Sequence, residues 1–336
     1  MHYLKSVIVD IDRSHSRLGK AVAFTMIAAK ARKAIIIVSP AGMGKSTTSN
    51  ALATHHPEVI VIDAISEAGL SAKQDLFTDY NGVVVIDDLG KLGSHYRRLH
   101  TLIAMSELVY SHYQKSYMWG NPIDITNFTG SAILNVQPAI LGSLIASDEW
   151  EVVLMDKTIR YYHLYRPIHP NPQPPELDLK WGIDVDLVKT PTSRGKMWRD
   201  LTKIGQVQWS DARVVEHIID LLRATAALDS RKEVENQDYS LLVDLMKPLT
   251  IERYLIDKFS FESGRNFKNN MLAIMIEVAS WNKLTVYRVA RDYKLTPRRA
   301  GELITSFGGG ALTADMFSGV IKPTEDLKRV LREAGA

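Results

Sequence analysis

The chain has 336 residues, of which 46% are hydrophobic and 24% are charged, as in ordinary globular proteins. No apolar stretch approaches the roughly 20 residues of a membrane span, and residues 1–12 lack the apolar centre of a secretion signal, so we expect a cytoplasmic protein outside the membrane. There is no cysteine, which excludes disulfides, thiolate catalysis and cysteine-ligated zinc. The formal net charge is only +3, so any surface for nucleic acid must be local.

The first 33 residues predict two elements. The β-branched run Val7-Ile8-Val9 favours a short strand, and apolar residues at near-helical spacing between Arg17 and Lys33 favour a helix. We expect both to form a lead-in that packs beside the segment that follows.

A glycine-rich turn follows the apolar run from Ile35 to Val38, and a helix-compatible segment comes after it. This is the context of a P-loop, in which backbone N–H groups and a helix N-terminus surround a phosphate. Ser39 stands where the motif has its first glycine, which we expect to alter the loop only slightly. The alternative is a turn that carries Gly-Lys-Ser by chance. The residues expected to bind ATP are Pro40, Ala41, Gly42, Met43, Gly44, Lys45, Ser46 and Thr47; Lys45 is expected to reach the β- and γ-phosphates, and Ser46 to bind Mg²⁺.

Two further continuous apolar runs, at 59–62 and 83–86, are typical of parallel strands that are buried on both faces. The second run ends in Asp87 and Asp88, which matches a Walker B motif. We expect Asp87 to hold Mg²⁺ and Asp88 to polarise the water that attacks the γ-phosphate. Acids that end a strand at a solvent edge by chance are the alternative.

A helix is predicted from His95 to Gln114, with Arg97 and Arg98 in its first turn, either as ordinary solvated charges or facing a neighbouring subunit or DNA. The next predicted strand ends in Asn135, where open α/β sheets bind ligands. We expect Asn135 to orient the attacking water, the alternative being a turn-forming residue. A helix is predicted from about Pro138.

Residues 151–166 predict a strand, a turn and a second strand, with Lys157 and Arg160 near the turn. Five prolines between Pro167 and Pro175 exclude a helix and predict a stiff linker, where we place the first domain boundary. Residues 176–209 fit either a nucleic-acid surface or a packed connector; the residues at issue are Arg194, Lys196, Arg199, Trp181 and Trp198.

Ser210 and Asp211 predict the start of an amphipathic helix with Arg213 in its first turn. A second helix is expected from about Asp238 to Met246, where Pro248 stops it. Residues 210–249 are therefore expected to form a small helical unit.

The last 87 residues, 250–336, carry a helical apolar stretch from Met271 to Val278 and then a helix-turn-helix pattern. Thr296 and Pro297 supply the N-cap and first position of its second helix. Between Lys283 and Arg299 there are six basic residues and one acid. Glycines 308–310 allow a turn into a wing. A helical unit for protein contacts is the alternative. The residues expected to bind DNA are Arg288, Arg291, Lys294, Arg298 and Arg299.

With these motifs in this order, the chain resembles the AAA+ ATPases over about residues 34–246. The stretch VVVIDDLGKL is similar to the replication-initiator and helicase-loader branch. The stretch beginning SDARVVEHIID is similar to the minichromosome-maintenance branch, which also carries a C-terminal winged helix. The resemblance implies that Asn135 is sensor 1, that Arg213 is sensor 2 and contacts the γ-phosphate, and that Arg160 is the arginine finger that completes a neighbour's site.

The expected fold is α/β: a P-loop NTPase core of the AAA+ type with a parallel sheet (residues 1–166), a linker (167–209), a helical lid (210–249) and a winged helix-turn-helix (250–336). The expected function is an oligomeric Mg²⁺-dependent ATPase that binds or remodels duplex DNA during replication, as a ring or filament, with a helicase or another replication protein as a further partner. The alternatives are an ATP-switched transcriptional or partition regulator that hydrolyses slowly, and a motor for a protein or packaging substrate.

Overall fold

The computed structural model describes residues 2–39, 42–117, 122–145, 147, 149–163, 171, 173–252, 285–292, 294–307, 312–315, 318–325 and 328–329. Within these ranges no helix is long and apolar enough to cross a membrane. The predicted helix at 271–278 and the glycines at 308–310 lie outside the described residues, as does most of the proline-rich stretch.

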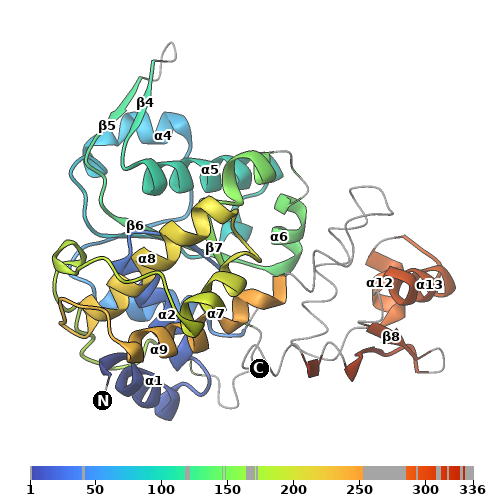
Figure 1. The fold of residues 1–336 in the computed structure, drawn as a ribbon. Coiled ribbons are helices and arrows are strands. Elements are labelled where there is room, and N and C mark those ends of the chain that lie inside the picture. The colour runs from blue at the N-terminus through green and yellow to red at the C-terminus, as the bar shows by residue number, and fades with distance from the viewer. Residues whose placement is uncertain are drawn as a thin grey trace.

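A parallel five-stranded sheet, in the order β2-β3-β6-β1-β7, forms the centre of the larger part of the chain (Figure 1). Its strands are β1 (Ala34–Val38), β2 (Val59–Ile62), β3 (Val83–Ile86), β6 (Ser131–Val136) and β7 (Thr158–Tyr162). In β1, β3, β6 and β7 side chains of both orientations are buried, because both faces of the sheet are covered by helices, whereas the edge strand β2 leaves Val61 60% exposed. The expectation of an α/β fold with a parallel sheet is confirmed.

One face of the sheet packs against helices from both ends of the described core. Ile35 and Ile37 point to this face and share a hydrophobic core with α2 and α8. The helices on this side are α1 (Tyr3–Ser14), α2 (Gly19–Lys30), α3 (Lys45–His55), α7 (Lys196–Gly205), α8 (Asp211–Leu228) and α9 (Asn236–Met246). The predicted helices at 210–249 are therefore present and pack on α2, which lies against β1 and β6.

The opposite face buries Ile36 and Val38 against α5 (His95–Ser111). Shorter helices complete this side: α4 (Glu67–Ala72) and α6 (Pro138–Ile145), together with a π-helical turn at Trp150–Leu154. A two-stranded antiparallel ribbon, β4 (Gln114–Ser116) and β5 (Ile123–Ile125), extends beyond α4 and α5 in Figure 1.

Two predicted strands are wrong. Val7-Ile8-Val9 lies inside α1, because Leu4, Val7 and Ile11 are buried at helical spacing against α2 and this packing outweighs local β-propensity. Residues 151–154 belong to the π-helical turn, so only the second half of the predicted strand pair, β7, is a strand.

The described C-terminal residues contain α12 (Val286–Asp292), α13 (Pro297–Phe307) and an antiparallel pair, β8 (Leu312–Ala314) and β9 (Ile321–Pro323). Thr285 adds a β-bridge to Val320. The turn between the helices works as expected: Lys294 adopts φ 55°, and Thr296 Oγ1 accepts from the Arg299 N–H at 3.2 Å. These residues have a small core of their own, in which Ala300 and Ile304 are buried.

Candidate functional site

The turn from β1 to α3 has the backbone that an anion-binding loop requires. Gly42 and Gly44 have φ of 77° and 89°, and Lys45 is the first residue of α3. At Gly44 a Cβ atom would lie 2.6 Å from Leu18 Cδ1, so glycine is needed for conformation and for space. Of the residues expected to bind ATP, Pro40 and Ala41 lie outside the described residues.

Lys45 is 7% exposed at the start of α3. Burial lowers its pKa, while the carboxylates of Asp88 and Asp87 act in the opposite direction. A lysine held in this position, next to a helix N-terminus, is suited to meet an anionic ligand whose charge offsets the cost of burying the ammonium group.

Asp87 and Asn135 come together because of the strand order. β6 lies between β1 and β3, and Leu134 pairs with Ile86, so the next residues on each strand are level. Asn135 Nδ2 donates to Ser49 Oγ at 2.8 Å and to Asp87 Oδ1 at 3.4 Å. Asn135 Oδ1 is buried and has no hydrogen-bond partner within the described residues, which leaves an acceptor that water can fill.

Asp88 lies one residue further, at the start of a 3₁₀ turn. Its Oδ1 accepts from the Gly90 N–H at 2.8 Å, so one carboxylate oxygen caps the turn. Lys91 lies 3.1 Å from Asp63 and 3.7 Å from Asp87, and it joins the acids that end β2 and β3.

The donor set fits Mg²⁺ bound together with a nucleotide. Magnesium keeps several waters and takes one or two protein oxygens plus phosphate, so a cluster of carboxylates is not required. No group of three metal-binding side chains occurs in the described ranges. Asp87, with a side chain 28% exposed, and the half-buried Ser46 offer the two oxygens that such a site needs.

Sequence reasoning missed His163, which follows β7. Its Nε2 donates to the Met43 carbonyl, inside the glycine turn, at 2.7 Å, and its own N–H donates to Val38 O at 2.9 Å. The side chain is buried, and burial lowers its pKa to about 4. No local pattern marks this histidine, because the contact joins residues 120 positions apart.

The prediction that Arg160 is an arginine finger is wrong. Arg160 lies in the middle of β7 with 0% exposure, and its guanidinium donates to Glu252, with Nη2 to Oε1 at 2.7 Å. Gln208 Oε1 accepts from the Arg160 N–H, and the Tyr162 hydroxyl donates to Glu252 at 2.9 Å. A side chain enclosed in this way cannot reach another subunit, so Arg160 is a structural residue of the core.

The role of sensor 2 does not suit Arg213. Its guanidinium pairs with Glu216 at 2.8 Å and lies over the Tyr110 ring, and Glu216 also faces Lys33, which precedes β1. The first turns of α8 therefore lie at the amino ends of the strands, whereas Lys45 follows their carboxyl ends. Five strand residues span about 16 Å, which separates Arg213 from a phosphate at Lys45 within the same subunit.

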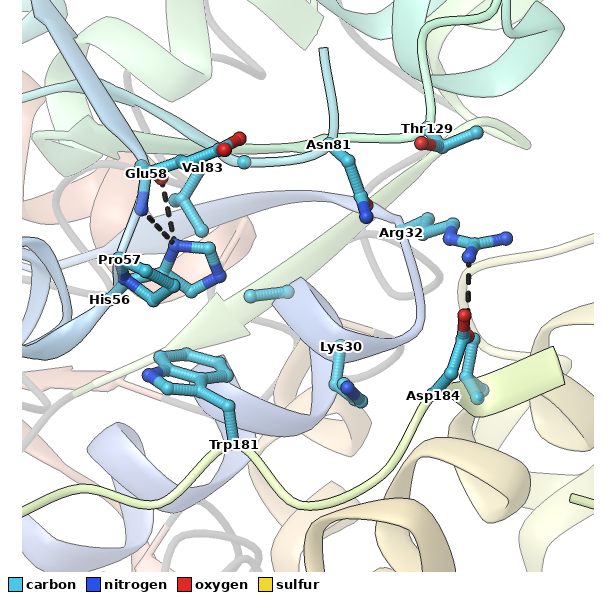
Figure 2. Close-up of a pocket in the computed structure, with 13 residues that line it drawn as sticks. Lys30, Arg32, His56, Pro57, Glu58, Asn81, Val83, Thr129, Trp181 and Asp184 are labelled. Carbon is cyan, nitrogen blue, oxygen red and sulfur yellow. Dashed lines mark hydrogen bonds and ion pairs between the residues drawn. The ribbon is translucent and has the colours of Figure 1, made fainter. Parts of the chain in front are cut away.

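A polar cavity of about 350 Å³ opens at the amino edge of the sheet (Figure 2). Lys30 and Asn81 approach it from opposite walls in the view, and Arg32 lies 3.5 Å from Asp184. Trp181 packs edge-on against His56, with ring centroids 4.5 Å apart. Trp181 is half-buried and Trp198 is buried, so these two tryptophans of residues 176–209 act as parts of a packed connector.

All five basic residues expected to bind DNA are exposed on α12, α13 and the turn between them. Arg298 and Arg299 have side chains that are 86% and 61% exposed, and both pair with Glu302. The structure thus brings together Lys45, Ser46, Asp87, Asp88 and Asn135 in one site, and the basic residues at 288–299 on another surface.

The comparisons with known proteins add no family. No protein-family model matches the sequence, and no curated protein resembles it at a significant level.

Proposed function

We propose that this protein is a Mg²⁺-dependent ATPase of the AAA+ type that assembles into an oligomer and acts on DNA through a C-terminal winged helix. The observation that carries the proposal is the strand order, which sets Asn135 between the glycine turn after β1 and Asp87 after β3. A buried lysine, a carboxylate and an amide around one anion-binding turn are the groups that phosphoryl transfer to water needs.

In this proposal each residue has a separate task. Lys45 and the turn N–H groups bind the phosphates, and Ser46 and Asp87 hold Mg²⁺, which neutralises charge that develops on the phosphate oxygens. Asn135 Oδ1, the buried acceptor without a partner in the described residues, orients the attacking water. The other oxygen of the Asp88 carboxylate polarises that water, while its Oδ1 caps the turn at Gly90.

Two features support the DNA-binding half. The elements α12, α13, β8 and β9, with a β-bridge at Thr285, form a helix-turn-helix followed by a ribbon, and two of the five basic side chains, Arg298 and Arg299, lie in the first turn of its second helix. Residues at the start of a recognition helix contact base edges and phosphates. Because Arg160 is enclosed in the core, the exposed Arg97 and the half-buried Arg98 on α5 remain the candidates for a trans-acting arginine.

The test is ATP hydrolysis against protein concentration, with and without duplex and single-stranded DNA. We expect the rate per subunit to rise with concentration and to rise again with DNA. Asp87→Asn is expected to abolish Mg²⁺-dependent hydrolysis. Asp63→Asn is the matched control, because Asp63 ends the neighbouring strand and also meets Lys91, yet has no hydrogen bond to Asn135 within the described residues. Normal hydrolysis by the Asp87 variant would overturn the assignment.

A second candidate function is an ATP-switched DNA-binding regulator. The hydrogen bond from Gly90 to Asp88 favours it, because a carboxylate that caps a turn has less freedom to activate water. Tight ATP binding with a flat, very slow hydrolysis rate that DNA does not stimulate would support this candidate over the motor.

A further inference from the structure

The end of β7 is tied to the glycine turn. β7 runs parallel to β1, with Tyr162 level with Val38, so His163 lies beside the point where the chain enters the turn. The backbone N–H of His163 donates to Val38 O at 2.9 Å, which continues the ladder by one residue. The imidazole then reaches over the turn, and Nε2 lies 2.7 Å from the Met43 carbonyl oxygen.

The direction of this hydrogen bond is settled by chemistry. A carbonyl oxygen only accepts, so Nε2 must carry the proton and donate. His163 is 1% exposed, and burial and the nearby charge of Lys45 both lower its pKa. The ring is therefore neutral at physiological pH and has a defined tautomer.

The hydrogen bond from His163 orients the whole peptide group between Met43 and Gly44. The carbonyl of Met43 and the N–H of Gly44 belong to one planar trans peptide and point in opposite directions. Within the described residues, no carbonyl accepts a hydrogen bond from the Gly44 N–H. Holding Met43 O against His163 therefore turns the Gly44 N–H away from His163, and an anion-binding turn needs its N–H groups to face the ligand in this way.

The turn is fixed at its other end as well. The Ser39 N–H donates to Val136 O on β6 at 3.1 Å, and Ser39 is fully buried. The two neighbours of β1 thus hold the two ends of the turn: β6 through Ser39, and the end of β7 through Met43. A peptide plane with one such anchor removed is free to rotate, because the φ of Gly44 has no Cβ to restrict it.

We propose that His163 is a positioning residue for nucleotide binding: it holds the Met43 carbonyl and so presents the Gly44 N–H to the phosphates of the nucleotide. This inference rests on the proposed ATPase function and adds a specific determinant to it. His163 does not touch the reacting atoms, and it acts through the peptide that does.

His217 provides a matched control within the same protein. It is also fully buried, its pKa is also lowered to about 4 by burial, and its Nε2 donates to a carbonyl, that of Asp156, at 2.8 Å. It lies at the amino edge of the sheet, away from the glycine turn. If nucleotide affinity depends only on keeping a buried histidine, both substitutions should lower it. If it depends on the position of the Gly44 N–H, only the His163 substitution should lower it.

The experiment measures ADP and ATP affinity by calorimetry, and KM and kcat for hydrolysis, in the full chain. His163→Ala is expected to weaken both nucleotides about 10-fold and to raise KM, with kcat within about 2-fold of the wild type, since the lost hydrogen bond acts on binding. His163→Gln, whose amide can donate to Met43 O, is expected to recover most of the affinity. His217→Ala is expected to leave affinity unchanged, with thermal unfolding showing that each variant is folded.

The outcomes separate the two levels of the proposal. Wild-type affinity in a folded His163→Ala protein, or an equal loss in His217→Ala, overturns the positioning role and leaves the ATPase proposal intact. A wild-type protein that binds neither ADP nor ATP overturns the proposed function and this inference with it.

Discussion

At the amino edge of the sheet, basic residues form ion pairs with acids of other elements, whereas at the carboxyl edge Asp87, which also pairs with Lys91, lies beside Asn135. Arg32 lies 2.9 Å from Asp186, and Lys33 lies 2.6 Å from Asp220. At the other edge, Asp87 stays part-exposed, and Asn135 Oδ1 is a buried acceptor with no partner in the described residues.

The comparison also separates His163 from His217, and it separates the two arginines to which the sequence assigned catalytic roles. His163 supports the turn at the carboxyl edge, and His217 supports Asp156 at the amino edge. Arg160 lies between the edges in the core, and Arg213 lies at the amino edge. Position in the sheet, more than residue type, therefore decides which of these groups lie beside the proposed nucleotide site.

The largest expected effect concerns the core between the edges. Arg160→Ala leaves the buried Glu252 carboxylate, 3% exposed, without its cation, and we expect a loss of about 3–5 kcal/mol in the free energy of unfolding. Arg213→Ala, at a pair that is about two-fifths exposed, should cost less than about 1 kcal/mol. Urea unfolding of both variants checks this, and equal losses would contradict the assignment of Arg160 to the core.

The next effect tests the carboxyl edge itself. Lys45→Ala removes the cation that meets the phosphates, and we expect ATP affinity to fall about 100-fold, with stability little changed. Lys30→Ala, which lines the cavity at the amino edge, is the control and should bind ATP as the wild type does. Calorimetric titration gives both values. If Lys30→Ala lowered ATP affinity instead, the nucleotide would bind at the amino edge of the sheet, contrary to our proposal.

A third prediction concerns the pH dependence of stability that His163 and His217, one at each edge of the sheet, should both produce. The pKa of His163 and of His217 is lowered to about 4, chiefly by burial, from about 6.5 in an unfolded chain. Between these values the unfolded chain binds more protons, so stability falls as pH falls, by up to about 1.4 kcal/mol per pH unit for each histidine. His163→Gln and His217→Gln should each reduce the slope of the unfolding free energy against pH by that amount between pH 6.5 and 4, as measured by urea unfolding. An unchanged slope would contradict a neutral, buried imidazole at that position.

The smallest effect concerns the C-terminal unit. Arg298→Ala removes one exposed cation at the start of α13, and we expect duplex DNA affinity to fall about 3- to 5-fold, with a salt slope lower by about 1. Arg199→Ala, an exposed arginine of the connector, is the control. Fluorescence anisotropy over a range of salt concentrations measures both, and a loss with Arg199 alone would move the DNA surface to the connector.

Local patterns in the sequence were sufficient for much of the fold and for part of the site. The continuous apolar runs predicted β1, β2, β3 and β6, because strands covered on both faces need apolar side chains in both orientations. The turn at Gly42 and Gly44, the turn after β3 and the Thr296 cap also lie where the sequence predicted turns, since glycines and capping side chains favour these conformations locally. Lys45, Asp87 and Asn135 were found by these patterns.

The features of the fold and the candidate site that local patterns did not predict depend on contacts between residues far apart in the chain. The sequence by itself determined most of the strands and the position of the glycine turn, because these follow from short-range sterics and apolar patterning. Only the tertiary structure decided that β6 enters between β1 and β3, that Arg160 meets Glu252, and that His163 holds Met43. The physical reason is that the energy of a buried polar group depends on the partner that packing brings to it.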